Sequence, residues 1–404
     1  MNVPEIRFKE FCDYYSDVLL EKCLSVSNKK NNKLEYKKED ALSVSDEFGV
    51  VNQIEHLGRS YTGNNISTYK ILNKWQIVYT KSPLKLKPFG IIKVNNNKPG
   101  IVSVLYAIYD VKEGFDPNYI SVYFEPNFRL NKYLLPLINK GAKNTINISD
   151  ETALSGEVHI PLSYTEQQKI ASYFQSLDSL IQTTSKKLAS LKRIKAASLQ
   201  SMFPQEGETV PKVRFKGFEG EWEEKSFSAL YKKSIIKNDL TFGTDKIISV
   251  ANMYYLTNVN VSDLEYLKTY NIMKLGDIAF EGNKSKRFLH GRFVENTIGD
   301  GIVSHVFVVF HPISAEHDIN YWKYAINNEN IMRNVLIRCT KSSTMMTDLV
   351  VNDFLKETIL VPSYAEQQKI GAYFRNLDQQ ISLQTQRLEK IKQIKAACLD
   401  KMFV

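Results

Sequence analysis

Two stretches of this sequence decide its fold: SYTEQQKIASYFQSLDSLIQTTSKKLASLKRIKAASLQSMF at 163–203 and SYAEQQKIGAYFRNLDQQISLQTQRLEKIKQIKAACLDKMF at 363–403. The offset between the two is constant at 200 residues and no gap is needed. About half of the positions are identical, which chance does not produce in a sequence of mixed composition. The chain is therefore two tandem copies of one unit.

Each copy of this segment has the pattern of one long helix. Ser163 or Thr165 can cap the first helix and Ser363 the second, because short hydroxyl side chains are favoured just before a helix. Apolar residues then recur at spacings of three, four and seven, which is the stripe of an amphipathic helix. The stripe consists of Ile170, Phe174, Leu177, Ile181, Leu188, Leu191 and Ile194 in the first copy, and Ile370, Phe374, Leu377, Ile381, Leu388, Ile391 and Ile394 in the second.

The stripe is close to the seam of a coiled coil, and a seam needs a partner helix. Because both copies carry the same seam, we predict that the two helices pack on each other as an antiparallel coiled coil with pseudo-two-fold symmetry. A helix of about forty residues is about 60 Å long and could hold two domains at a fixed distance. The alternative is an ordinary core helix in each half.

A second repeat links the start of the chain to its middle. VPEIRFKEF at 3–11 returns as VPKVRFKGF at 210–218, directly after the first helix. The chain's start thus has the sequence expected after its own last helix. This circular order predicts that Phe8 and Phe11 lie near Met402.

The segments outside the helices are rich in strand signals, such as WQIVYT and GIVSHVFVVF, separated by Asn/Gly/Pro clusters. GIVS occurs at 100–103 and again at 301–304, so the two globular segments are divergent copies. We predict the α+β class, with a mostly antiparallel sheet and a helical piece at 320–336. The predicted division is 1–160 for the first domain, 161–205 for the first spacer helix, 206–361 for the second domain and 362–404 for the second spacer helix.

The composition bounds the protein's partners only weakly. The formal net charge of +9 fits a polyanion partner, and it also fits mere solubility. The four cysteines form no CxxC pair, so we expect no zinc site and no disulfide framework. A charged N-terminus and the lack of a long apolar run predict no membrane association and a cytoplasmic location.

No familiar catalytic motif is present. The sequence has no GxxxxGK[ST] phosphate loop, no GxGxxG and no HExxH. A nuclease site could be sought in Asp277, Glu281 and Lys284, but the lysine stands three residues after the glutamate instead of two. We expect a chain without catalytic residues, without a metal and without a cofactor of its own.

Two basic loops occupy equivalent places in the two domains. The first is TKSPLKLKPFGIIK at 80–93 and the second is EGNKSKRFLHGR at 281–292. Lysine and arginine side chains can bind phosphates, and serine and asparagine side chains can hydrogen-bond to base edges. Because the two loops lie at equivalent places in the repeat, the sequence favours DNA binding over two merely solvated loops. The candidate DNA-binding residues are Lys81, Ser82, Lys85, Lys87, Lys93, Asn283, Lys284, Ser285, Lys286, Arg287 and Arg292.

The chain resembles the specificity subunits of type I restriction-modification systems over essentially its whole length. The most specific marks are the two PxxxEQQKI…YF…LD…IK…MF helices, the RFxxF motifs and FEGEWEE at 218–224. The first copy has FCDYYSD at 11–17 in place of FEGEWEE, so the segment that leads into the first domain could have a different local structure.

This resemblance implies two target recognition domains that each read one half of a split sequence in double-stranded DNA. It implies two methyltransferase subunits docked on the helices and domains, and two motor-nuclease subunits in the full complex. S-adenosylmethionine, ATP and Mg²⁺ would be bound by those partners. The alternatives are a stand-alone DNA methyltransferase or nuclease with a disguised site, and a protein-binding coiled-coil scaffold. The bases recognised, the spacer length and the balance of restriction and methylation stay open.

Overall fold

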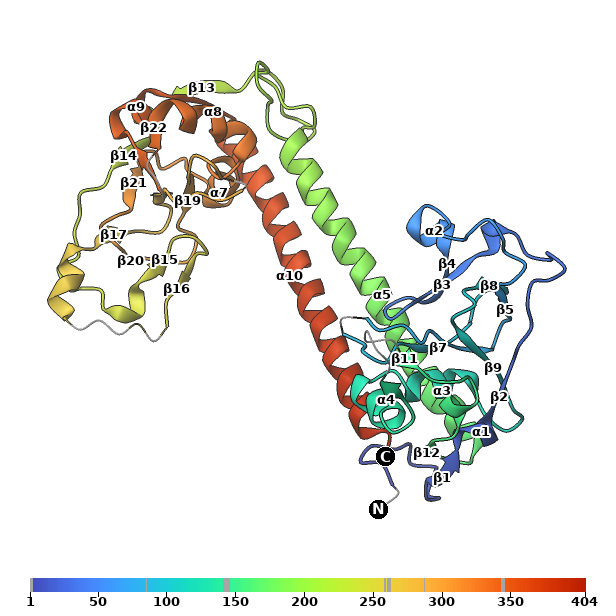
Figure 1. Ribbon diagram of the computed structural model, residues 1–404. Helices are drawn as coiled ribbons and strands as arrows, with labels where there is room; N and C mark the ends of the chain where they lie inside the picture. The colour runs from blue at the N-terminus through green and yellow to red at the C-terminus, as the bar shows by residue number, and fades with distance from the viewer. Residues whose placement is uncertain are drawn as a thin grey trace. The chain divides into compact units, whose positions relative to one another are not determined.

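The computed structural model describes residues 3–84, 86–140, 146–257, 259, 263–286, 288–342 and 346–404 (Figure 1). It divides into two compact units, residues 1–185 with 386–404, and residues 186–385. Each unit contains one β-rich domain and part of each long helix, α5 (Tyr164–Ser201) and α10 (Tyr364–Lys401).

The first unit is built on a four-stranded antiparallel sheet of order β2-β9-β6-β7 with two-stranded ribbons around it. The sheet strands are β2 (Leu24–Val26), β9 (Ala107–Val111), β6 (Ile77–Tyr79) and β7 (Ile92–Val94). The ribbons are β1 (Ser16–Leu19) with β12 (Glu157–Ile160), β3 (Leu42–Ser45) with β4 (Gly49–Asn52), β5 (Lys70–Leu72) with β8 (Gly100–Val102), and β10 (Asn139–Lys140) with β11 (Ile146–Asn147). The short helices are α1 (Leu20–Cys23), α2 (Gln53–Leu57), α3 (Pro117–Tyr123) and α4 (Asn127–Leu134).

The second unit repeats this plan with a sheet of order β14-β21-β18-β19. Its sheet strands are β14 (Tyr231–Lys233), β21 (Val308–Pro312), β18 (Ile278–Glu281) and β19 (Arg292–Glu295). Its ribbons are β13 (Glu223–Ser226) with β24 (Thr358–Val361), β15 (Ile248–Ser249) with β16 (Tyr254–Tyr255), β17 (Asn271–Met273) with β20 (Gly301–Val303), and β22 (Thr340–Ser342) with β23 (Thr347–Leu349). Its short helices are α6 (Phe227–Leu230), α7 (Ile319–Ala325), α8 (Glu329–Cys339) and α9 (Val351–Lys356).

The sheet of each unit is covered on both faces, which explains its unbroken apolar strands. In β6, Ile77 and Tyr79 belong to the cluster that contains the long helices, whereas Val78 belongs to the cluster with ribbon residues such as Leu42 and Leu72. Successive residues of a strand point to opposite faces, so a run of three buried residues needs two cores. The predicted α+β class and antiparallel pairing are confirmed. The single helical piece predicted at 320–336 is wrong in detail, because Asn328 caps a second helix, α8, after α7 has ended.

The EQQ motif fastens the start of each long helix. The hydroxyl oxygens of Ser163 and Ser363 accept hydrogen bonds from the backbone N–H groups of Glu166 and Glu366, so serine is the cap in both copies. The side-chain oxygen of Gln167 accepts the backbone N–H of Asp116, the residue before α3, at 2.9 Å. The first glutamine of the motif therefore ties α5 to a short helix of its own domain.

The RF motif confirms the circular order of the repeat. The Ile6 N–H donates to the carbonyl of Lys401 at the end of α10, and the Val213 N–H donates to the carbonyl of Ser201 at the end of α5. Phe8 packs on Tyr173 in an edge-to-face contact and belongs to the surroundings of the cluster that contains Met402, as predicted. Phe11 donates its N–H to the Phe8 carbonyl, and its contact with Met402 stays a prediction.

An ion pair joins the same two motifs. In the first unit the Arg7 guanidinium donates to both carboxylate oxygens of Glu166, at 2.7 and 2.8 Å. In the second unit Arg214 binds Glu366 in the same bidentate way, at 2.7 Å for both bonds. In each unit the arginine of the RF motif is therefore held by the glutamate at the start of a long helix, α5 in the first unit and α10 in the second.

Within each unit the long helices run antiparallel, as predicted. In the first unit Tyr173 and Asp178 of α5 contact Cys398 and Lys395 of α10. In the second unit Tyr373 and Asp378 of α10 contact Ser198 and Lys195 of α5 in the same manner. The beginning of one helix thus packs against the end of the other.

Most residues of the predicted apolar stripe are buried or partly buried. Ile170, Phe174, Leu177, Leu188, Leu191, Ile370, Phe374, Leu377, Leu388 and Ile391 are buried, and Ile181 and Ile381 are partly buried. Ile194 and Ile394, in contrast, are 44% and 38% exposed, so their assignment was wrong. After Leu191 the inward positions are Lys195, Ser198 and Met202, because steps of four, three and four residues follow the helical period.

Each long helix ends by inserting its Met-Phe pair into an aromatic core. Phe403 lies among Tyr119, Tyr123 and Phe174 in the first unit, with ring centroids 5.7–5.9 Å apart. Phe203 lies among Trp222, Tyr321 and Phe374 in the second unit. The MF ending of both repeats is therefore a core element, so each helix is anchored at both ends.

Candidate nucleic-acid interface

The two basic loops occupy the same structural place, the connection between the last two strands of each four-stranded sheet. One loop joins β6 to β7 and the other joins β18 to β19. Leu84 and Lys87 exchange two backbone hydrogen bonds in the first loop, and Ser285 donates its N–H to the Phe288 carbonyl in the second. Both loops thus narrow to a tight turn at equivalent positions.

A glycine closes each loop. Gly90 has a φ of 85° and Gly291 a φ of 75°, in the region that side chains disfavour. A Cβ on Gly291 would stand 2.7 Å from the backbone oxygen of Glu281, so glycine is needed for close approach as well as for its backbone angle. The sequence repeat at these two positions thus reflects one loop geometry.

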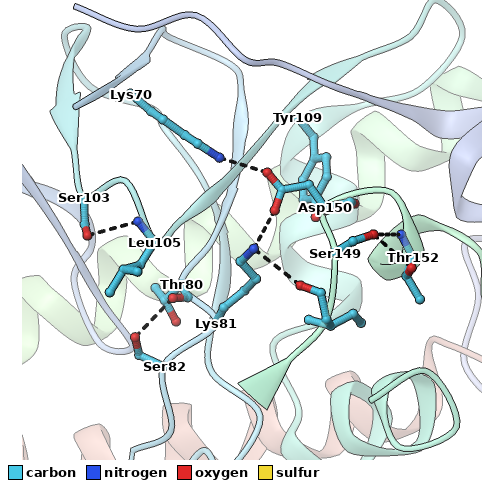
Figure 2. A network of polar contacts seen from close by, with 11 residues as sticks. Lys70, Thr80, Lys81, Ser82, Ser103, Leu105, Tyr109, Ser149, Asp150 and Thr152 are labelled. Atoms are coloured by element: carbon cyan, nitrogen blue, oxygen red, sulfur yellow. Dashed lines mark hydrogen bonds and ion pairs between the residues drawn. The ribbon is translucent and has the colours of Figure 1, made fainter. Parts of the chain in front are cut away.

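Lys81 of the first loop is bound within its own domain. Its ammonium group lies 2.5 Å from Asp150, which Lys70 approaches at 2.8 Å from strand β5 (Figure 2). Burial alone would raise the pKa of Asp150, but the hydrogen bonds from both lysines outweigh it and lower that pKa. Ser82, the neighbouring candidate, donates to the carbonyl of Thr80. These side chains hold the base of the loop against the segment around Asp150.

Lys87 and Lys93 are also turned inward. Lys87 is buried, donates to the carbonyl of Glu125 at 2.7 Å and forms an ion pair with Asp46 at 3.2 Å. Burial lowers the pKa of Lys93, and the carboxylates of Glu125 and Asp46 oppose that effect. Lys85 lies outside the described residues.

The candidates of the second loop divide into exposed and paired residues. Asn283, Lys284, Ser285 and Lys286 are exposed, and Lys284 donates to the Ser342 hydroxyl of the β22–β23 ribbon. Arg292, by contrast, binds Glu281 at 2.6 Å and the Ala251 carbonyl at 2.7 Å. Arg287 lies outside the described residues.

Sequence reasoning missed the residues that position the first loop. Glu125 joins the loop to the helices, because its backbone oxygen accepts from Lys87 and its carboxylate from Lys395 of α10 at 2.5 Å. Asp150 was missed as well, since neither residue has a counterpart in the second domain that would have drawn attention to it. Arg7 and Arg214 could have been found, because they repeat at equivalent places in the RF motif.

The carboxylates that a nuclease would need are held by internal partners. Asp277 lies 2.6 Å from His311, and Glu281 binds Arg292. Within the described ranges no group of three His, Cys, Asp or Glu side chains is placed to hold a metal ion. The same part of the chain contains no helix long and apolar enough to cross a membrane.

Comparisons with known proteins agree with this architecture. Residues 220–393 match the model of the type I restriction modification DNA specificity domain. No curated protein matches the sequence.

Several solved structures are similar to this chain, among them the following three. The crystal structure of a type I restriction-modification S subunit from M. genitalium has a TM-score of 0.59 at 10% identity, covering 100% of this chain and 99% of that one. An HsdS subunit from Thermoanaerobacter tengcongensis has a TM-score of 0.45 at 13% identity, with 96% of both chains covered. A chain from a study of the complex assembly and conformational transition of the type I R-M system has a TM-score of 0.47 at 12% identity, with 96% of this chain and 97% of that one covered.

The similarity to the M. genitalium structure over the whole chain supports the fold. The family model matches the second half of the chain, and the first half repeats the same sheet order. Over residues 220–393 the chain is therefore similar to the type I restriction modification DNA specificity domain.

Proposed function

We propose that each β-rich domain reads one half of a split sequence in double-stranded DNA, and that the chain delivers this reading to a complex whose other subunits carry the chemistry. The observation that carries the proposal is the same glycine-closed loop at the same sheet position in both β-rich domains, the second of which lies in the range that matches the DNA specificity domain. One DNA-contacting loop in each domain fits a DNA target sequence that is split into two half-sites.

The candidate contacts then fall into two roles. The exposed residues Asn283, Lys284, Ser285 and Lys286 meet DNA directly, through phosphates and base edges. Lys81, Lys87 and Arg292 are paired with carboxylates and hold the shape of their loops. Lys85 and Arg287 complete the proposed basic surfaces, whereas Lys93, which is turned inward near Glu125 and Asp46, supports the loop from beneath.

The helices are proposed to set the gap between the two half-sites and to receive the partners. These would be two methyltransferase subunits, with two motor-nuclease subunits in the complete assembly. S-adenosylmethionine, ATP and Mg²⁺ would be bound by the partners. A specificity subunit needs only to bind, which fits carboxylates such as Asp277 and Glu281 that are occupied by internal pairing.

Mapping methylated adenines in DNA from cells with and without this chain tests the proposal. We expect a split motif that appears only when the chain is present together with its methyltransferase subunits. The stand-alone enzyme predicts methylation or cleavage by the purified chain alone. The protein scaffold predicts no motif and no salt-sensitive DNA affinity even with partners added.

A further inference from the structure

The loop between β6 and β7 carries an apolar side chain at its end. Two backbone hydrogen bonds between Leu84 and Lys87, of 2.9 and 3.0 Å, close a four-residue turn that contains Leu86. The Leu86 side chain is 76% exposed. It belongs to none of the apolar clusters formed by the described residues.

The turn is fastened to the domain on both sides of Leu86. The Leu86 carbonyl accepts a hydrogen bond from the Asn127 side chain at 2.6 Å, and Lys87 donates to the Glu125 carbonyl at 2.7 Å. Pro83 and Pro88 flank the turn and fix the backbone φ angle at their positions. Leu86 is therefore held outward by a hydrogen-bonded turn, so little conformational entropy is lost when it meets a ligand.

The narrow shape of the β6–β7 hairpin and the lysine that precedes Leu86 in the sequence favour DNA as that ligand. The major groove admits a two-stranded β-ribbon, and each thymine presents its 5-methyl group there as an apolar contact. Of the four lysines in the loop sequence from 80 to 93, Lys81 and Lys87 are paired with carboxylates of the domain, and Lys85 directly precedes Leu86 in the sequence. A stable protein interface needs about 800 Å² from each partner, far more than one turn supplies.

We propose that Leu86 is a base-reading residue of the first domain and that it contacts the methyl group of a thymine in the major groove. The proposal rests on the proposed function, since it requires that the domain reads DNA. It assigns base reading to an apolar side chain in a loop whose other candidate residues are lysines and a serine. The exposed leucine then serves discrimination between bases, whereas the lysines around it serve loop shape and phosphate attraction.

Leu86→Ala provides the test, because an exposed side chain contributes little to folding. The full chain, purified with its methyltransferase partner, is titrated with duplexes that carry the mapped target. We expect Leu86→Ala to weaken binding by roughly 5- to 30-fold, from the apolar area that a leucine of this exposure can bury. Leu135→Ala, at a leucine 57% exposed after helix α4, is the matched control and should bind as the unaltered chain does.

Uracil in place of thymine then identifies the contact, since uracil lacks only the methyl group. At one thymine of the half-site read by the first domain, this change should weaken the unaltered chain and leave Leu86→Ala unaffected. Equal affinity of Leu86→Ala and the unaltered chain would overturn the inference. A loss on Leu86→Ala with no effect of uracil at any thymine would overturn the thymine contact. Absence of any methylation motif would instead overturn the proposed function.

Discussion

Replacing Arg214 by methionine tests the bond between the RF and EQQ motifs. Glu366 has a side chain only 1% exposed, and Arg214 supplies both of the hydrogen bonds to its carboxylate oxygens described above. Methionine fills similar space without charge and leaves a buried carboxylate unpaired. Breaking a buried pair in this way costs about 3–5 kcal/mol of unfolding free energy. For a unit of this size, that loss lowers the melting temperature by roughly 6–20 °C.

Tryptophan fluorescence reports on this unit in urea unfolding. Trp222 and Trp322 are buried in the second unit, whereas Trp75 of the first unit is 48% exposed and changes its environment less on unfolding. The Arg214→Met transition should shift to lower urea without a change of slope. The double variant Arg214→Met/Glu366→Gln should recover part of the loss, because no buried charge remains.

The first unit supplies an internal comparison. Tyr15 donates a hydrogen bond to Glu166, and Trp222 takes the corresponding place in the second unit. Arg7→Met therefore leaves its glutamate with one partner and should cost about 1 kcal/mol less than Arg214→Met, as measured by circular dichroism. A loss below about 1 kcal/mol for Arg214→Met, or losses that simply add in the double variant, would contradict a buried, coupled pair.

Four further predictions concern the cores, the pH response and the reading of DNA. Phe203→Ala and Phe403→Ala should each destabilise their unit by about 3–5 kcal/mol in urea unfolding, since both rings lie in aromatic cores. Burial lowers the pKa of His317 to about 4, so the stability that the neutral imidazole contributes is complete above pH 6.5 and lost as the pH falls toward 4. His317→Gln should therefore flatten the fall in the melting temperature of the second unit over that range. Lys286→Ala should reduce the slope of log affinity against log salt by about one for every target sequence, as a phosphate contact requires. Matched four-residue insertions after Asp178 and Asp378 add about one helical turn, 5.4 Å, to each helix, and should lengthen the methylated motif's spacer by one or two base pairs of about 3.4 Å each; an unaltered motif would contradict a spacing role of the helices.

Repetition is what made much of this protein predictable. The apolar stripe from Ile170 to Leu191 and its copy 200 residues later determined two long helices, because a helical period leaves its mark on every third or fourth residue. The return of the RF motif after the first helix determined which end of the chain meets the end of α10. Both are local patterns that a sequence displays twice.

The prediction of the apolar stripe failed where a polar residue occupies a position at which the two long helices pack on each other. Ile194 continues the apolar pattern but is exposed, while Lys195 lies at the helix contact and reaches Asp378. The apolar pattern favours Ile194 over Lys195 for the inward position. The pattern cannot show that the carboxylate of Asp378 lies opposite the lysine. For the same reason, the sequences of the basic loops did not show which lysines are paired with carboxylates of the domain and which can contact DNA.

The sequence by itself determined the two-fold repetition and the two long helices. Each of these depends on residues close together in the chain or on a copied segment. Only the tertiary structure decided that Lys81 and Lys87 are bound to Asp150 and Asp46, and that Leu86 stands exposed between two fastened residues. The physical reason is distance along the chain: whether a side chain is free or occupied depends on which distant charges the fold brings within a few ångströms of it.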